Sequence, residues 1–106
     1  MAYKTINNPE LYFQTKLYTG NGANNRAITF DGDENMQPDW LWIKNRSEAQ
    51  SHALFDSVRG ATKRYGTNST GAESTENTNL DSFDTNGFTV DNELIVNGSS
   101  DLMVAW

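Results

Sequence analysis

The stretch Asp39-Trp40-Leu41-Trp42-Ile43-Lys44-Asn45 decides the fold of this chain. Successive side chains of an extended strand point to opposite faces, so Trp40 and Trp42 share one side. Leu41 and Ile43 share the other side. Both faces are apolar, which is typical of a central strand that is covered on both sides. We therefore predict that this strand lies in the middle of the core.

Shorter apolar runs flank that strand and are separated by Asn, Gly and Asp, which favour turns. The runs that we interpret as strands are 11–18, 26–30, 51–58, 87–90, 94–96 and 102–106. In the first of them, Leu11, Phe13, Thr15 and Leu17 alternate with more polar residues and are expected to form its apolar face. Residues 67–79 are almost wholly polar and are expected to form an exposed loop.

Short strands at a spacing of roughly 8 to 12 residues, without a helical period, predict an all-β chain. We expect an antiparallel β-sandwich of the jelly-roll or lectin-like kind, with short strands and long polar loops. A length of 106 residues leaves room for one domain. We place an N-terminal arm at 1–10 and the sandwich at 11–106.

The two ends of the chain suggest how it is used. Asn7-Asn8-Pro9 favours a turn, so the residues before it are interpreted as an arm that docks on another protein. The candidate docking residues are Met1, Tyr3, Ile6 and Pro9. At the other end the apolar run closes on Trp106 without a polar tail, so we expect the first domain of a longer chain.

Charge and composition narrow the function classes. The chain carries 14 acidic and 8 basic side chains, a net charge of -6 that repels nucleic acid phosphates and anionic membrane surfaces. We therefore expect neither nucleic acid nor membrane as a partner. There is no cysteine, no apolar run of transmembrane length and no signal peptide, so synthesis in the cytoplasm is expected.

Catalytic chemistry finds little support in the sequence. His52, Asp56 and Ser57 include the residue types of a hydrolase triad, but a triad requires tertiary geometry that nothing in the sequence indicates. Strand alternation places His52 on the same face as Leu54, where a partly buried or edge histidine is the simpler interpretation. We predict that the chain is not an enzyme and has no catalytic residues.

A metal site is also a weaker interpretation than its alternative. Asp31, Asp33 and Asn35 alternate like the oxygen ligands of a calcium loop. The bidentate acid that an EF-hand loop needs at a later fixed position is missing, which favours a solvated acidic turn. We predict neither a bound metal nor a cofactor.

Aromatic residues next to Asn and Asp offer a further possibility. Many lectins stack an aromatic ring on one face of a sugar and hydrogen-bond the hydroxyls with amides and carboxylates. The candidate glycan contacts are Tyr12, Tyr18, Trp40 and Tyr65. In so short a chain the same rings are needed for the core, which is the stronger expectation.

Five blocks of sequence are characteristic when taken together: YTGNG (18–22), QPDWLWIKNR (37–46), SHALFDSVRG (51–60), SFDTNGF (82–88) and VAW (104–106). They resemble an uncharacterised domain family of marine and cyanobacterial tailed phages, whose members are predicted tail-fibre or other virion structural proteins. The resemblance covers nearly the whole chain from Phe13. It carries over no catalytic residue.

The resemblance implies a virion structural protein that is made in the host cytoplasm and incorporated into the particle. We expect the virion-proximal domain of a tail fibre or tailspike that serves assembly and host attachment, as a homotrimer because fibres commonly are. Its partners would be tail, adaptor or capsid proteins. The alternatives are a capsid decoration or head-fibre protein and a carbohydrate-binding module that contacts host surface glycans.

Overall fold

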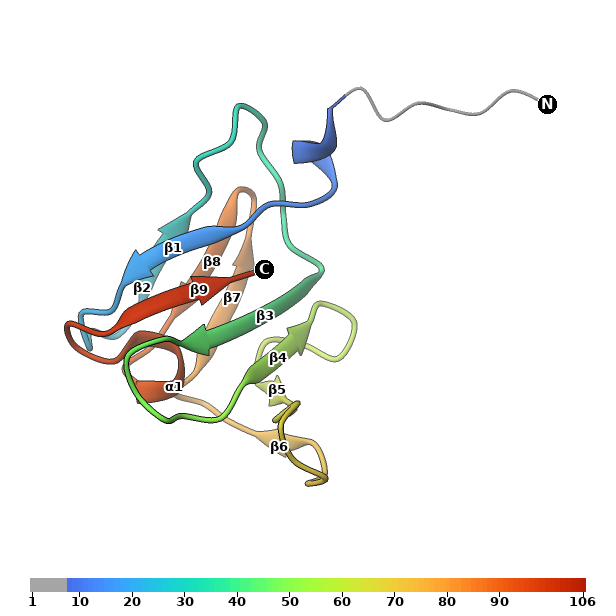
Figure 1. Ribbon diagram of the computed structural model, residues 1–106. Helices are drawn as coiled ribbons and strands as arrows, with labels where there is room; N and C mark the ends of the chain where they lie inside the picture. The colour runs from blue at the N-terminus through green and yellow to red at the C-terminus, as the bar shows by residue number, and fades with distance from the viewer. Residues whose placement is uncertain (1–7) are drawn as a thin grey trace.

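The computed structural model describes residues 8–106, which form two antiparallel β-sheets and a small hairpin (Figure 1). The four-stranded sheet has the order β1 (Lys16–Thr19), β9 (Leu102–Ala105), β3 (Trp40–Asn45), β4 (Ala53–Asp56). The three-stranded sheet has the order β2 (Arg26–Thr29), β8 (Gly87–Val90), β7 (Leu80–Asp84). The hairpin joins β5 (Lys63–Arg64) to β6 (Ser74–Thr75). The prediction of an all-β antiparallel sandwich is confirmed.

The core lies between the two sheets and is built from alternate residues of their strands. The four-stranded sheet contributes Leu41, Ile43, Phe55 and Met103, all without exposed surface. The other sheet and the segment that follows β2 contribute Ile28, Phe30, Phe88 and Val90. The Phe88 ring lies at the centre, since its centroid is 6.0 Å from those of both Tyr18 and Phe30. One aromatic side chain therefore joins the two layers.

Strand β3 is an inner strand of its sheet, as predicted, but only one of its faces is covered. Leu41 and Ile43 are fully buried, whereas Trp40 on the opposite face is 50% exposed. The second sheet packs against the face that carries Leu41, and within residues 8–106 no second layer lies over Trp40. The expectation of a strand covered on both sides is therefore wrong for the tryptophan face.

The first predicted strand is shorter than expected, and the face that we predicted to point inward points to solvent. Pro9–Leu11 forms a 3-10 turn, so the strand begins at Lys16. Leu17 is 63% exposed, whereas Tyr18 is buried and its hydroxyl donates a 2.7 Å hydrogen bond to the Val96 carbonyl. Tyr18 packs on Phe88 and donates to a buried acceptor, and these two contacts together stabilise an inward tyrosine more than burial of Leu17 would. The prediction had considered only the alternation of the aliphatic residues.

The predicted strand at 94–96 is wrong, because Leu94–Asn97 forms the single helical turn α1. The turn brings Asn97 into the interior, where its amide donates to Asn21 Oδ1 and to the Ala23 carbonyl. Asn97 Oδ1 accepts from the backbone N–H of Asn21. The hydrogen bonds of Asn97 therefore hold the loop between β1 and β2 against the helical turn.

The polar segment 67–79 is largely irregular and exposed, as predicted. It includes the two-residue strand β6, whose pairing with β5 the polar composition did not reveal. The hairpin between β7 and β8 turns at residues 85–86, and Gly87, which begins β8, has φ +148°. A Cβ atom there would lie 1.9 Å from the Ile28 carbonyl oxygen, so the Asn-Gly turn requires glycine.

Asn45 ends β3 and is fully buried. Its amide nitrogen donates to the Leu94 carbonyl at 3.0 Å and to Asp101 Oδ2 at 2.8 Å. Its Oδ1 accepts from the backbone N–H groups of Ser47 and Glu48. One side chain thus holds together α1, the loop before β9 and the turn after β3.

Candidate functional site

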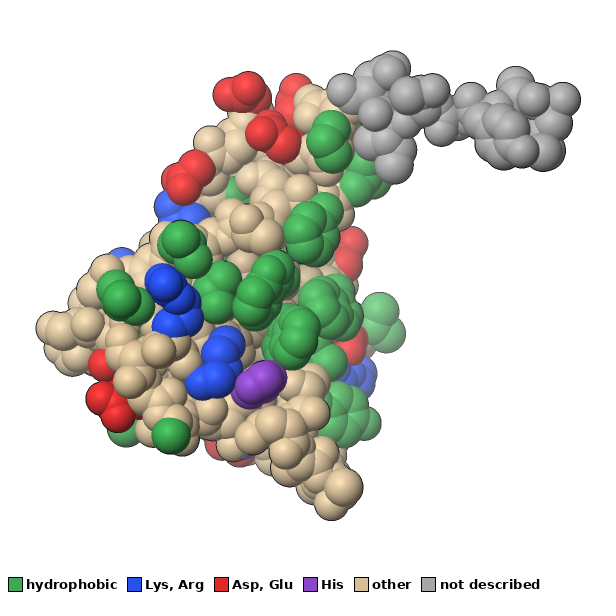
Figure 2. All heavy atoms as spheres, in the orientation of Figure 1, with side chains coloured by type: hydrophobic (Ala, Val, Ile, Leu, Met, Phe, Trp, Pro, Cys, Tyr) green, Lys and Arg blue, Asp and Glu red, His purple; other side chains and the backbone are tan. Residues whose placement is uncertain are grey.

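The outward face of the four-stranded sheet carries an unusual set of apolar side chains. We call Trp40, Trp42, Trp106, Leu54 and Val104 the aromatic face. Strand register brings these residues together: Trp42 is opposite Leu54 on β4, and its backbone exchanges hydrogen bonds of 2.8 and 2.9 Å with Trp106. Figure 2 shows hydrophobic side chains gathered over this sheet, beside basic residues and the single histidine.

The rings of the aromatic face touch one another. The Trp42 ring centroid lies 6.0 Å from that of Trp40 and 5.1 Å from that of Trp106. The His52 ring packs at 5.7 Å against Trp42. Trp42 Nε1 donates to Thr67 Oγ1 at 3.1 Å, so the edge of the cluster is anchored to the polar loop. These contacts hold the rings of the aromatic face in position relative to one another.

Two positive groups border the aromatic face. Lys44 follows Trp42 on the same side of β3, opposite Val104, and its Nζ donates to the Asn45 carbonyl. Arg59 lies over the Tyr65 ring, 4.2 Å from its centroid, and pairs with Asp56 and Glu73. The Arg59 backbone N–H and then its guanidinium lower the pKa of the Asp56 carboxyl, which stays ionised in this turn.

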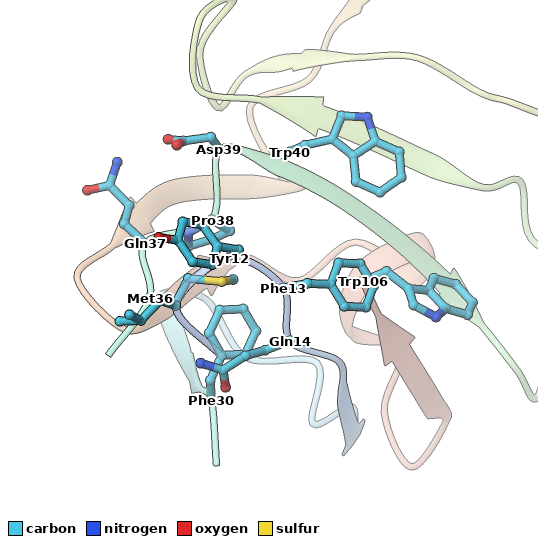
Figure 3. A pocket seen from close by; sticks show the side chains of 11 residues that line it. Tyr12, Phe13, Gln14, Phe30, Met36, Gln37, Pro38, Asp39, Trp40 and Trp106 are labelled. Atoms are coloured by element: carbon cyan, nitrogen blue, oxygen red, sulfur yellow. The ribbon is translucent and has the colours of Figure 1, made fainter. Parts of the chain in front are cut away.

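A pocket of about 270 Å³ opens at one end of the aromatic face (Figure 3). Its walls come from the segment before β1, from Phe30 and from the residues that lead into β3: Leu11, Tyr12, Phe13, Gln14, Phe30, Met36, Gln37, Pro38, Asp39, Trp40 and Trp106. Figure 3 shows Tyr12 against Pro38 and Met36, with Phe13 reaching toward Trp106. The lining is mainly apolar, which suits a hydrophobic group better than a charged one.

The four tyrosine and tryptophan candidates for glycan contact fall in three places. Tyr12 and Trp40 are 70% and 50% exposed and line the same pocket. Tyr65 is exposed but lies beneath Arg59, away from that pocket. Tyr18 is a core residue, and its assignment as a surface contact is wrong because burial and its hydrogen bond to Val96 hold it inside.

The three residues of the hypothetical triad have other partners. His52 packs on Trp42, Ser57 Oγ donates to Asp39 Oδ1 at 3.0 Å, and Asp56 is bound by Arg59. His52 lies on the side of β4 that carries Leu54, as the alternation indicated.

The acidic turn has neighbours of its own. Asp31 pairs with Lys16 at 2.6 Å, and the Asp33 backbone N–H donates to Glu10. Within residues 8–106, no group of three acidic or histidine side chains is placed to hold a metal ion.

Of the candidate docking arm, Met1, Tyr3 and Ile6 lie outside the described residues. Pro9 begins the 3-10 turn. No helix within residues 8–106 is long and apolar enough to cross a membrane.

Sequence reasoning missed Trp42, Trp106 and Phe13 as surface groups. The alternation in β3 could have identified Trp42, because it gives the strand two apolar faces. A chain this short has too few residues to cover both faces, so one of them must stay at the surface. Phe13 was assigned to an inward face, but the strand starts after it and leaves its ring 57% exposed.

Comparison with known proteins gives one match. The model of a family described as a domain of unknown function, DUF7483, matches residues 8–106. No curated protein and no solved structure matches the chain.

Proposed function

The chain belongs to the DUF7483 family, and we propose that it is a structural domain of a tailed-phage virion that attaches to another virion protein through the aromatic face. The position that we assign to it is the virion-proximal part of a tail fibre or tailspike. The phage assignment depends on the five sequence blocks described above. The proposed mode of attachment is supported by the position of the aromatic face in the structure.

The observation that carries this proposal is that three neighbouring tryptophans lie on the outward face of one sheet, with Trp40 exposed and Trp42 and Trp106 partly exposed. Apolar patches that remain exposed on a small domain mark interaction surfaces. Tryptophan is prominent among the residues that dominate binding energy, because it buries a large area at little cost in side-chain entropy. Lys44 and Arg59 at the border add polar contacts of the kind that surround such an apolar centre.

Replacing Trp40 by glutamate tests this mode of attachment. Trp40 is half exposed, so the domain should still fold, while a carboxylate in a desolvated interface has no partner. We expect incorporation of the protein into particles to fall at least about tenfold, corresponding to a loss of roughly 1.4 kcal/mol or more. The measurement is quantitative immunoblotting of purified particles, with circular dichroism of the isolated variant as a check of folding.

Val58→Glu is the matched control, because Val58 is 94% exposed and lies in the turn after β4. Equal incorporation of both variants would contradict docking through the aromatic face. Antibody labelling of intact particles in the electron microscope then distinguishes a tail fibre from a capsid decoration protein. A particle that carries no label would refute the virion role itself.

A second candidate function is glycan binding, favoured by the pocket that Tyr12 and Trp40 share. Exposed rings in a pocket with Gln37 and Asp39 at its wall provide stacking surfaces and hydrogen-bonding groups for a sugar. On a glycan array we expect sugar-dependent binding that Tyr12→Ala and Trp40→Ala abolish. Tyr65→Ala, which lies outside the pocket, should retain that binding. Absence of binding to every glycan would exclude this candidate and leave the docking proposal intact.

A further inference from the structure

The two sheets leave one side of the sandwich open. Strand β1 is the outer strand of the four-stranded sheet, and β2 is the outer strand of the three-stranded sheet. They follow each other in sequence, and a groove of about 650 Å³ lies between them, lined by Lys16–Thr19 and Arg26–Thr29 with Asp31. Within the described residues, no backbone hydrogen bond joins β1 to β2.

Strand register shows which backbone groups face this groove. The Gly20 N–H donates to the Asp101 carbonyl, so in the same ladder Tyr18 and Lys16 exchange hydrogen bonds with β9. The alternate residues Leu17 and Thr19 therefore direct their N–H and C=O groups away from β9, toward the open side.

The same reasoning applies to β2. The Phe30 N–H donates to the Asn86 carbonyl, which places Ile28 and Arg26 in the hydrogen-bonded pairs with β8. Ala27 and Thr29 then face the open side, and both are exposed. Apart from the Thr19 carbonyl, which accepts from Arg26, two strands thus present unpaired ladder groups on the two sides of one groove.

In the part of the chain that the structure describes, two side chains cross the groove, one at each end. Lys16 at the start of β1 reaches Asp31 beyond β2, and Arg26 at the start of β2 donates to the Thr19 carbonyl. Charged residues at such positions restrict which strands can pair with an edge. The far edge of the four-stranded sheet differs, because Tyr65 exchanges backbone hydrogen bonds of 2.9 and 3.0 Å with Leu54 and covers β4.

We propose that the groove between β1 and β2 accepts residues 1–7 of a second copy of this chain as an added β-strand. Seven extended residues span roughly 23 Å, and a four-residue strand needs roughly 13 Å, so the segment is long enough to pair and still connect to its own domain. Extended segments commonly bind an exposed sheet edge through main-chain hydrogen bonds.

Strand propensity favours the same occupant. Tyr3-Lys4-Thr5-Ile6 contains tyrosine, threonine and isoleucine, which have high strand propensity. Lys4 is the only charged side chain in residues 1–7. The Asp31 carboxylate at one end of the groove pairs with Lys16 and is still 78% exposed, so it can also accept a hydrogen bond from an added lysine. This inference does not rest on the aromatic face.

The test compares the purified 106-residue chain with a variant that lacks residues 1–7, using light scattering after size-exclusion chromatography. We expect the full chain to associate as its concentration rises and the deletion variant to remain monomeric. A synthetic peptide of residues 1–9 should bind the deletion variant, as measured by fluorescence anisotropy of a label on the peptide. A 106-residue chain that stays monomeric, or a deletion variant that associates equally well, would overturn the proposal.

Ala27→Pro locates the binding edge. Proline at this position removes an N–H that faces the groove and leaves the pairing of β2 with β8 intact, so folding should be retained. We expect the affinity of the peptide for this variant to fall at least about tenfold. Ala27→Val keeps the N–H, so its affinity for the peptide should equal that of the deletion variant with Ala27. Equal binding by the two variants would exclude β2 as the edge that pairs with the peptide. Because these measurements use the isolated chain, their failure leaves the virion role untouched.

Discussion

Replacing Phe88 by alanine is expected to cost about 3–5 kcal/mol of unfolding free energy, the range for truncating a buried phenylalanine. Phe88 has no exposed surface and packs edge-on against Tyr18 while it also contacts Phe30. Those two residues belong to different layers of the sandwich. The alanine variant would therefore leave a cavity between the two sheets and remove packing contacts that join them. Because small domains are stable by only about 5–15 kcal/mol, the variant should be largely unfolded at moderate urea concentrations.

Urea denaturation followed by far-ultraviolet circular dichroism measures this loss. Val58→Ala is the control, since Val58 is 94% exposed and its truncation should change the free energy of unfolding by less than about 0.5 kcal/mol. A change below about 1 kcal/mol for Phe88→Ala would mean that the two sheets do not pack through this ring.

Replacing Asn45 by alanine is expected to cost about 2–3 kcal/mol, although only a small polar side chain is removed. The substitution leaves the N–H groups of Ser47 and Glu48 and the Leu94 carbonyl without the Asn45 side chain as their partner. It also deprives the Asp101 carboxylate of a donor at 2.8 Å. Buried polar groups that lose a partner pay most of their desolvation cost.

Asn35→Ala is a suitable comparison, because Asn35 is an exposed asparagine in the acidic turn. Its unfolding midpoint in urea should match that of the parent chain. The Asn45 variant should unfold at lower urea with an unchanged dependence on denaturant, since the surface exposed on unfolding stays the same. Equal midpoints for the two variants would mean that Asn45 does not join α1 to the end of β3.

The all-β class, the turns and the position of β3 could be predicted because they depend on local patterns. Alternation in 40–45 and the Asn-Gly turn before Phe88 each specify their structure without help from distant residues. The orientation of β1 could not be predicted in this way. Leu17 and Tyr18 are both apolar enough to face inward, and the choice depends on the Val96 carbonyl, 78 residues away.

The helical turn α1 escaped prediction for a related reason. Leu94-Ile95-Val96 has the composition of a strand, but the burial of Asn97 and its bonds to the loop after β1 require a turn there. Of the predicted surface contacts, Tyr12 and Trp40 were placed together by the fold, and Tyr18 was not. Sequence identified aromatic residues as important, and only the register of three strands reveals which of them remain outside.

That arrangement has a spectroscopic consequence. The chain has three tryptophans, and all of them belong to the aromatic face, so none reports on the core. Their intrinsic emission therefore measures the water that reaches one surface of the folded domain. A partner that covers this surface should shift the emission to shorter wavelength without any label.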